Sequence, residues 1–335
     1  MVFLAPGFRQ LPKTRQARAL GLALAQASLG WVAPALRASV PAPVWRALGR
    51  AGAPVRLAPP SRHATLDPVL AAAELHRAGA RIERVREPEV SIVVPTAGAV
   101  EWLAAALASI AAYTQGVRYE VIVVDDASPD RVRVERALER HPGVTAFVNA
   151  TAHGFAASVN RGARAARGKS LVVLNDDVFV TPGWLEGLVR AKAAKARVAW
   201  VGPVSNDTGD GATIPARYRD LNELLAFAGT QRGAPRAMDK LALHAALLDR
   251  ARFEAVGGLD EGYVRGMFED DDLALALRAR GGRLFVAPDV YVHHAAGATF
   301  RALSPFEYFA CFELNRRRFE ERWHVRWRVR EGGEP

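Results

Sequence analysis

The sequence predicts an α/β fold in which strands and helices alternate and a mostly parallel sheet is flanked by helices. Three continuous apolar runs, at residues 90–95, 119–125 and 170–175, have the length and composition of strands buried on both faces. Helical patterns separate these runs, which is the rhythm of a doubly wound sheet. Ligands bind such sheets at the carboxyl ends of the strands, so the residues that follow each strand are the first candidates for a functional site.

The other elements follow in chain order. Asp67 is a suitable N-cap for a short helix, with Pro68 in its first turn and Gly79 as its stop. The spacing of apolar residues predicts further helices at residues 100–113, 130–140, 155–167, 184–195 and 269–280. Apolar runs predict further strands at residues 144–149, 198–204 and 282–294.

Charge divides the chain into a basic leader and a nearly neutral body. Of the net charge of +10 over 335 residues, the first 88 residues carry +9, with 13 Lys and Arg against 4 Asp and Glu. We therefore expect a basic, mainly helical and proline-containing extension at residues 1–88, a globular domain at 89–303, and a C-terminal helix with a basic tail at 304–335. The neutral body argues against nucleic acid as a partner. The single cysteine, Cys311, excludes a disulfide framework and a multi-cysteine zinc site.

The basic ends predict attachment to an anionic membrane surface, with solvated charged segments as the alternative. The apolar run at residues 19–36 follows Lys13, Arg15 and Arg18, but polar residues and Pro34 interrupt it, which makes it a poor membrane-spanning helix. An interfacial or docking helix is the first interpretation of this run, and a cleaved signal peptide is the second.

Polar side chains follow the buried strands of the predicted sheet. Asn175, Asp176 and Asp177 end one of them, and their oxygens are ligands that suit Mg²⁺ or Mn²⁺ carrying a diphosphate. The alternative is a solvated turn, because Asn and Asp are common turn residues. His293 and His294 end the last strand, where a histidine could complete a metal site, although a lone histidine is more often structural.

Four consecutive carboxylates, at residues 269–272, open the last helix of the body. A simple N-cap needs one such residue, not four. Crowding of like charges raises the pKa of at least one of them, which suits a general base. A solvated helix start is the alternative interpretation.

The motifs together resemble the family 2 glycosyltransferases, which are inverting nucleotide-sugar transferases with the GT-A fold. The resemblance covers about residues 89–300, over five motifs in the family's order. These motifs are VSIVVPT, VIVVDDASPD, GFAASVNRGARAARGKSLVVLNDDVFVTPGWLEGL, FEAVGGLDEGYVRGMFEDDDLALALRARGG and PDVYVHHAAGATF. Two of these motifs depart from the family pattern, because Ala97-Gly98 replace the usual Tyr-Asn and Asn175 opens the acidic motif.

The resemblance implies roles for matching residues. Asp270, beside Glu269, corresponds to the catalytic base, and Asp177 and His294 correspond to the metal site, with His293 as the alternative histidine. The residues implied in nucleotide-sugar binding are Pro95, Thr96, Asp126, Asn160, Asn175 and Asp176. The residues implied in the donor and acceptor pocket are Trp184, Gly258, Asp260 and Asp272.

The expected activity is transfer of a sugar from a UDP-, GDP- or dTDP-sugar to an acceptor hydroxyl, with inversion at the anomeric carbon and with Mg²⁺ or Mn²⁺ as cofactor. The acceptor is expected to be a glycan, a lipid-linked or a protein acceptor in envelope or surface glycan synthesis. Because nucleotide sugars are cytosolic in bacteria, the resemblance implies a cytoplasmic location, peripheral on the inner face of the membrane. The alternatives are a sugar nucleotidyltransferase and a degenerate, membrane-associated carbohydrate-binding protein.

Overall fold

The computed structural model describes residues 64–208, 210–264, 266–295 and 305–327. Residues 61–298 form one compact unit, and residues 1–60 and 299–335 belong to another. In the second unit, the described element is the helix α12 (Pro305–Trp323). The predicted extension before residue 64 and the basic residues after 327 lie outside the described residues. The domain boundaries at residues 88 and 303 stay predictions.

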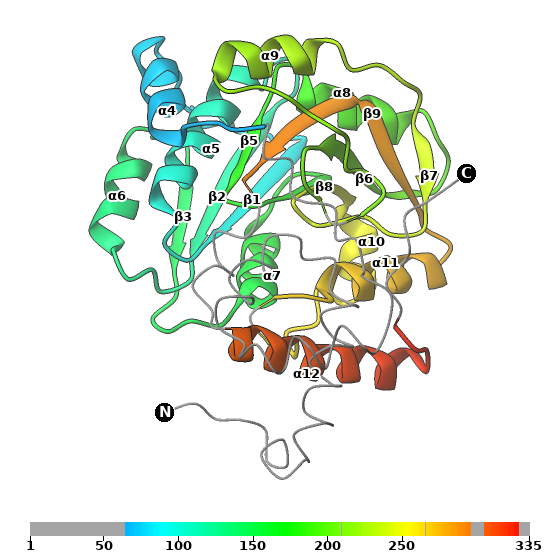
Figure 1. The fold of residues 1–335 in the computed structure, drawn as a ribbon. Helices are drawn as coiled ribbons and strands as arrows, with labels where there is room; N and C mark the ends of the chain where they lie inside the picture. Colours follow the sequence, from blue (N-terminus) through cyan, green and yellow to red (C-terminus); the bar gives the residue numbers. More distant parts are fainter. Residues whose placement is uncertain (1–63, 209, 265, 296–304, 328–335) are drawn as a thin grey trace, which may run out of the picture. The chain divides into compact units, whose positions relative to one another are not determined.

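A nine-stranded sheet forms the centre of the first unit (Figure 1). Its strands are β1 (Val90–Thr96), β2 (Tyr119–Asp125), β3 (Thr145–Val148), β4 (Ser170–Leu174), β5 (Val178–Val180), β6 (Val198–Ser205), β7 (Arg236–Met238), β8 (Ala245–Asp249) and β9 (Arg283–His294). Their order is β3-β2-β1-β4-β8-β6-β9-β5, and β7 pairs with β9. The parallel and antiparallel pairings make β8, β5 and β7 run against the other six strands. The predicted fold class, an α/β fold with a mostly parallel sheet, is confirmed.

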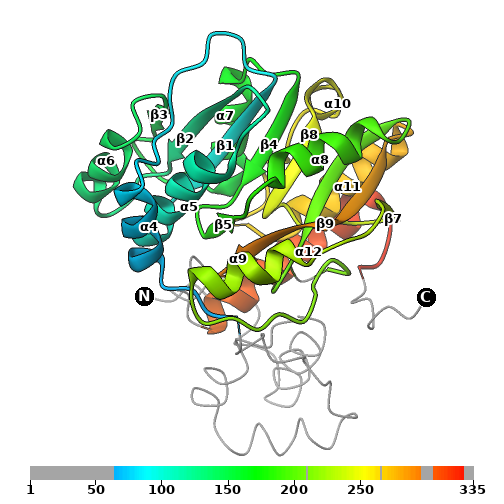
Figure 2. The same cartoon turned by 90° about the horizontal axis from the view of Figure 1, so that it is seen from above.

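Helices cover both faces of this sheet (Figure 2). The helices of the first unit are α4 (Pro68–Arg77), α5 (Val100–Tyr113), α6 (Arg131–Glu139), α7 (Phe155–Ala165), α8 (Trp184–Ala193), α9 (Leu221–Gly229), α10 (Arg250–Ala255) and α11 (Glu269–Ala279). Alternate side chains of β1 point to opposite faces, so Val93 packs in one core with α7, and Ile92 and Val94 pack in the other with α5 and α8. None of the helices in the described part of the chain combines the length and the apolar content that a membrane-spanning segment requires.

The strands β5, β7 and β8 and the helices α9 and α10 were absent from the prediction. The strand β8 matters most, because it inserts between β4 and β6 and pairs antiparallel with both. Its first residue, Ala245, is opposite Leu174, the last residue of β4. The start of β8 therefore lies at the same edge of the sheet as the carboxyl end of β4.

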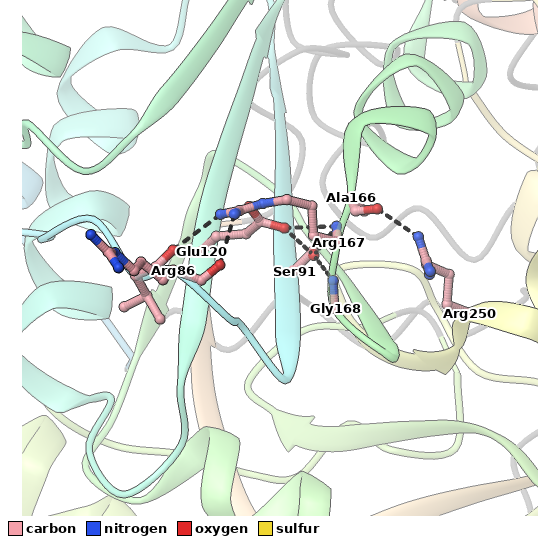
Figure 3. Close-up of polar contacts among 8 residues, drawn as sticks. Arg86, Ser91, Glu120, Ala166, Arg167, Gly168 and Arg250 are labelled. Atoms are coloured by element: carbon pink, nitrogen blue, oxygen red, sulfur yellow. Dashed lines mark hydrogen bonds and ion pairs between the residues drawn. The ribbon is translucent and has the colours of Figure 1, made fainter.

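At the opposite edge of the sheet, a charged network around the buried Glu120 carboxylate connects β1, β2 and β4 where these strands begin (Figure 3). The Glu120 carboxylate is buried and accepts hydrogen bonds from the Ser91 hydroxyl at 2.6 Å and from Arg167 Nε at 2.8 Å. The Gly168 amide donates to the Ser91 hydroxyl, and Arg167 also donates to the Arg86 carbonyl. The positive charge of Arg167 balances the negative charge of Glu120 within this network, because a buried carboxylate needs a partner of opposite charge.

The helix α7 packs against β1 with no room for a side chain at Gly162. A methyl group there would lie 2.4 Å from Val93 Cγ1, so its neighbours would have to move. We expect Gly162→Ala to lower the free energy of unfolding by about 1–3 kcal/mol, measured by urea denaturation. Gly229 of α9 is the matched control, because nothing lies within 4 Å of its added methyl group. Gly229→Ala is expected to be neutral or stabilising, and equal stability of both variants would contradict the packing argument.

Candidate functional site

Three strands bring their polar ends together at the carboxyl edge of the sheet. The register of β1 and β2 aligns Thr96 with Asp125, and the Asp126 amide donates to the Thr96 carbonyl. Across the next pair of strands, the Thr96 hydroxyl donates to Asp176 Oδ2 at 2.7 Å. Burial, and then the charge of Asp177, raise the pKa of Asp176 to about 7 in spite of that bond.

Asp177 and His294 face each other across β5 and β9. Their Oδ1 and Nε2 atoms are 3.2 Å apart, and the side chain of Asp177 is buried while that of His294 is 14% exposed. Nδ1 of His294 is 2.7 Å from the Asp207 carbonyl, which accepts only, so Nδ1 carries a proton. Burial alone would lower the pKa of His294, but Asp177 and the Asp207 carbonyl outweigh it and raise the pKa to about 9.

The structure separates the two adjacent histidines of β9. Successive side chains of a strand point to opposite faces, so His293 points away from Asp177. Its ring stacks on Trp102, and its Nδ1 lies 2.7 Å from the Tyr218 hydroxyl. Of the two histidines, His294 is therefore the one beside Asp177.

The donors at Asp177 and His294 fit one divalent cation. When the Nδ1–H of an imidazole is held by a carbonyl, Nε2 is the atom that can coordinate a metal once it has lost its proton, which is the usual arrangement of a metal-binding histidine. Adjacent ligands of an octahedral ion, each about 2.1 Å from it, lie about 3 Å apart, close to the observed separation. Within the described ranges, no three His, Cys, Asp or Glu side chains are grouped to hold a metal by themselves. A cation at this pair would therefore take its other ligands from substrate and water, as Mg²⁺ commonly does.

The acidic start of α11 contains carboxylates in different environments. Glu269 is buried and its Oε1 has no hydrogen-bond partner in the described part of the chain, whereas the side chain of Asp270 is 25% exposed. Burial, together with the neighbouring carboxylates, raises the pKa of Glu269 well above its usual range. Asp272 is buried and accepts a hydrogen bond from the Tyr263 hydroxyl. Asp270 is thus the better placed of the two predicted catalytic residues to receive a proton from a bound molecule.

Lys240 supplies positive charge to this acidic cluster. Its Nζ lies 2.6 Å from Asp271 Oδ2 and 3.9 Å from Asp270 Oδ2. Burial would lower the pKa of Lys240, but these carboxylates outweigh it and raise the pKa. Four residues later, the His244 ring stacks on His294 with centroids 5.3 Å apart. The segment 240–244 therefore connects the acidic cluster with the Asp177–His294 pair, and the Cα atoms of Lys240 and His244 are at most about 14 Å apart.

Several predicted site residues are occupied by contacts within the protein. The Asp126 carboxylate accepts hydrogen bonds from the Asn149 side chain and from the His153 and Gly154 amides, so it fastens the start of α7. Asn160 donates to the Leu259 carbonyl at 2.8 Å and accepts from the Leu259 amide at 2.9 Å. Binding of a nucleotide by Asp126 and Asn160 stays a prediction.

The residues predicted for the pocket lie in two places. Trp184 is 1% exposed and donates to the Thr114 hydroxyl, which places it in the core, and its position gives no support to a role in the pocket. Gly258, at φ +76°, packs against Asn160, because an added methyl group would lie 2.5 Å from Asn160 Oδ1. Asp260 follows Gly258 and adds its negative charge to the environment of Glu269. The loop that carries Gly258 and Asp260 therefore borders the acidic cluster, as Asp272 does.

Sequence reasoning missed Lys240, His244 and Asp207. The pattern around residues 240–244 offered no signal beyond an apolar stretch, because the strand β8 that places it was not predicted. His244 is buried, and neither ring nitrogen has a hydrogen-bond partner among the residues that the structure describes. Burial, and then the charge of His294, lower the pKa of His244 to about 3.

Comparisons with known proteins agree with this architecture. Residues 91–254 match the sequence model of Glycosyl transferase family 2. An uncharacterized protein of Sinorhizobium fredii is 30% identical over 62% of this chain and 25% of its own length. The dolichol-phosphate mannosyltransferase of Pyrococcus furiosus is 31% identical over 31% of this chain and 30% of its own. The succinoglycan biosynthesis protein ExoO of Rhizobium meliloti is 34% identical over 33% of this chain and 32% of its own. The aligned part of the chain thus spans between a quarter and a third of the length of these relatives.

A mannosyltransferase from Pyrobaculum calidifontis, solved with GDP-Man and Mn²⁺, is one of the similar structures. It is 21% identical, with a TM-score of 0.48, over 74% of this chain and 76% of its own.

The strands β2 to β8 and nearly all of β1, together with Thr96, Asp176 and Asp177 at the edge of the sheet, lie within the segment that matches this family. Residues 91–254 of this chain thus carry the sequence pattern of glycosyltransferase family 2.

Proposed function

We propose that the chain is an inverting glycosyltransferase that moves a sugar from a nucleoside diphosphate donor to an acceptor hydroxyl. The observation that carries this proposal is the segment 240–244, which contacts the acidic cluster through Lys240 and the Asp177–His294 pair through His244. This connection supports the proposal that a proton acceptor and a site for a cation serve one reaction at this edge of the sheet. UDP-, GDP- and dTDP-sugars are the candidate donors, and a glycan, a lipid-linked molecule or a protein is the candidate acceptor in envelope or surface glycan synthesis.

The mechanism assigns one task to each group. Asp177 and His294 would hold Mg²⁺ or Mn²⁺, which when bound supplies positive charge opposite the leaving diphosphate. The Asp270 carboxylate accepts the proton of the acceptor hydroxyl as that oxygen bonds to the anomeric carbon. The bond from the anomeric carbon to the donor phosphate breaks in the same step, so the nucleoside diphosphate leaves and the configuration inverts. Lys240 holds the acidic start of α11 in place for this transfer.

A screen of donors tests the proposal. The full-length protein is mixed with each nucleotide sugar of a panel in the presence of MnCl₂, and thermal shift and mass spectrometry record binding and products. We expect one donor class to raise the melting temperature and to release nucleoside diphosphate in the presence of acceptor. Release of pyrophosphate from a sugar phosphate and a nucleoside triphosphate would instead identify a nucleotidyltransferase. Binding of glycans with no turnover of any donor would identify a carbohydrate-binding protein.

The location at a membrane also remains a proposal, supported by the charge pattern. Of the net charge of +10, +9 lies in the first 88 residues. We expect the full-length protein to float with anionic liposomes at low salt. It is expected to dissociate at 1 M salt, because the distance over which charges attract one another there falls to about 3 Å. Neutral liposomes are the control. A protein that stays unbound to anionic liposomes at low salt would contradict the proposal.

A further inference from the structure

His244 differs from the other buried histidines of the described part of the chain. The ring of His141 accepts a hydrogen bond from the Ile82 amide, and the ring of His293 is bonded to the Tyr218 hydroxyl. Neither ring nitrogen of His244 makes a hydrogen bond of good geometry to a described residue, although its side chain is buried. The Ala242 backbone lies near enough to raise the pKa of His244, but it does so less than any other group. Buried polar groups without partners are rare in proteins, and a missing ligand is one cause.

The position of His244 in the fold indicates where a ligand would bond to its ring. It directly precedes β8, and its carbonyl accepts a hydrogen bond from the Asn175 amide, which fixes it at the carboxyl end of β4. Its ring is stacked on His294, at an interplanar angle of 23°. Asn175, its neighbour across the two strands, has a second buried atom without a partner, Oδ1. Two unsatisfied polar side chains therefore lie beside the Asp177–His294 pair.

We propose that His244 binds the donor directly, by donating a hydrogen bond from its imidazole to a diphosphate oxygen next to the cation held by Asp177 and His294. This inference rests on the proposed function. An imidazole carries at least one N–H in either protonation state, and the oxygens of an ionised diphosphate only accept. The centroid of the His244 ring lies 5.3 Å from that of His294, which would hold the same cation as the diphosphate oxygens. The structure thus assigns to His244 a contact that is made only when donor is present.

The test compares nucleotide affinity in wild-type protein and in His244→Phe. UDP, GDP and dTDP are each titrated by calorimetry in the presence of MnCl₂. Phenylalanine keeps an aromatic ring against His294 and removes both nitrogens, so we expect binding of the accepted nucleotide to weaken about 10- to 100-fold, as for loss of a hydrogen bond to a charged group. The melting temperature of the free protein is expected to stay the same or to rise, because a buried polar group without a partner has been removed.

Two further variants, a matched control and a conservative replacement, complete the comparison. Trp200 of β6 also has a buried N–H without a partner among the described residues, and its strand carries it into the core. Trp200→Phe is the matched control and is expected to leave nucleotide affinity unchanged. His244→Gln keeps an N–H donor on a side chain of similar reach, and is expected to recover part of the lost affinity. It also provides the test if His244→Phe does not fold.

The outcomes separate this inference from the proposed function. If wild-type protein binds a nucleoside diphosphate and both His244 variants bind it equally well, the inference fails and the proposed function stands. If manganese affinity without nucleotide, measured by electron paramagnetic resonance, falls as much as nucleotide affinity, His244 acts on the cation site and the diphosphate contact is refuted. If wild-type protein binds none of the three nucleotides, both proposals fall.

Discussion

Replacement of Asp270 by asparagine is expected to reduce kcat by a factor of about 10² to 10⁴, which corresponds to about 3–5 kcal/mol of transition-state stabilisation. Asparagine has the same shape as aspartate but cannot accept the proton of the acceptor hydroxyl. Glu269 cannot replace it, because burial raises the pKa of its carboxyl and favours the protonated form. Initial rates under saturating donor and acceptor, together with the donor dissociation constant, measure the effect. Donor affinity is expected to change by no more than a few fold.

Asp271 supplies the control for this experiment. It stands next to Asp270 on α11, and its Oδ2 atom forms the shorter contact with Lys240, at 2.6 Å. Asp271→Asn alters the charge of the same cluster without removing the predicted base, so its effect on kcat is expected to be much smaller than that of Asp270→Asn. Activity of Asp270→Asn within a few fold of wild type would exclude Asp270 as the base. A larger loss in Asp271→Asn would move the role to its neighbour.

Removal of divalent cations is expected to stop turnover, and Mg²⁺ or Mn²⁺ is expected to restore it. Asp177→Ala is expected to lower kcat at least 10²-fold and to abolish binding of Mn²⁺. The substitution removes one of the two proposed protein ligands, Asp177 Oδ1, which lies 3.2 Å from His294 Nε2. Turnover after treatment with EDTA and electron paramagnetic resonance of bound Mn²⁺ measure the two effects.

A carboxylate elsewhere on the sheet is the control for Asp177. Asp289 of β9, whose side chain is 24% exposed, is paired at 2.7 Å with the exposed Arg190. Asp289→Ala is expected to leave both Mn²⁺ binding and turnover close to those of wild type, since an exposed ion pair contributes little. Full activity of the wild-type protein in thoroughly chelated buffer would contradict the metal role and would leave Asp177 as a direct ligand of the substrate.

Local sequence signals predicted the first half of the sheet and its edge. The apolar runs at residues 90–95, 119–125 and 170–175 became β1, β2 and β4, because a strand covered on both faces needs apolar side chains at every position. The cap of α4 was equally local, and the Asp67 carboxylate accepts hydrogen bonds from the Val69 and Leu70 amides as expected. Thr96 and Asp176 are in contact because the parallel strands β1 and β4 end at a common edge, where candidate site residues were expected.

The second half of the sheet could not be predicted in the same way. The strand β8 is five residues long and runs antiparallel between two strands that are distant from it in sequence. A short apolar run carries no information about its neighbours or its direction, because periodicity records only which side chains are buried. The positions of Lys240 and His244 depend on β8 and therefore could not be predicted from the sequence.

The sequence by itself determined the fold class, the positions of the carboxylates at the strand ends, and the resemblance that points to Asp270, to Asp177 and to one of the two adjacent histidines. These features are encoded in short, contiguous segments. Only the tertiary structure decided that His294 and not His293 faces Asp177, that Asn160 holds the loop at Leu259, and that the segment 240–244 connects the acidic cluster to the histidine pair. Each of these depends on which strands lie side by side, and that choice is made by packing between segments up to 117 residues apart, as for Asp177 and His294.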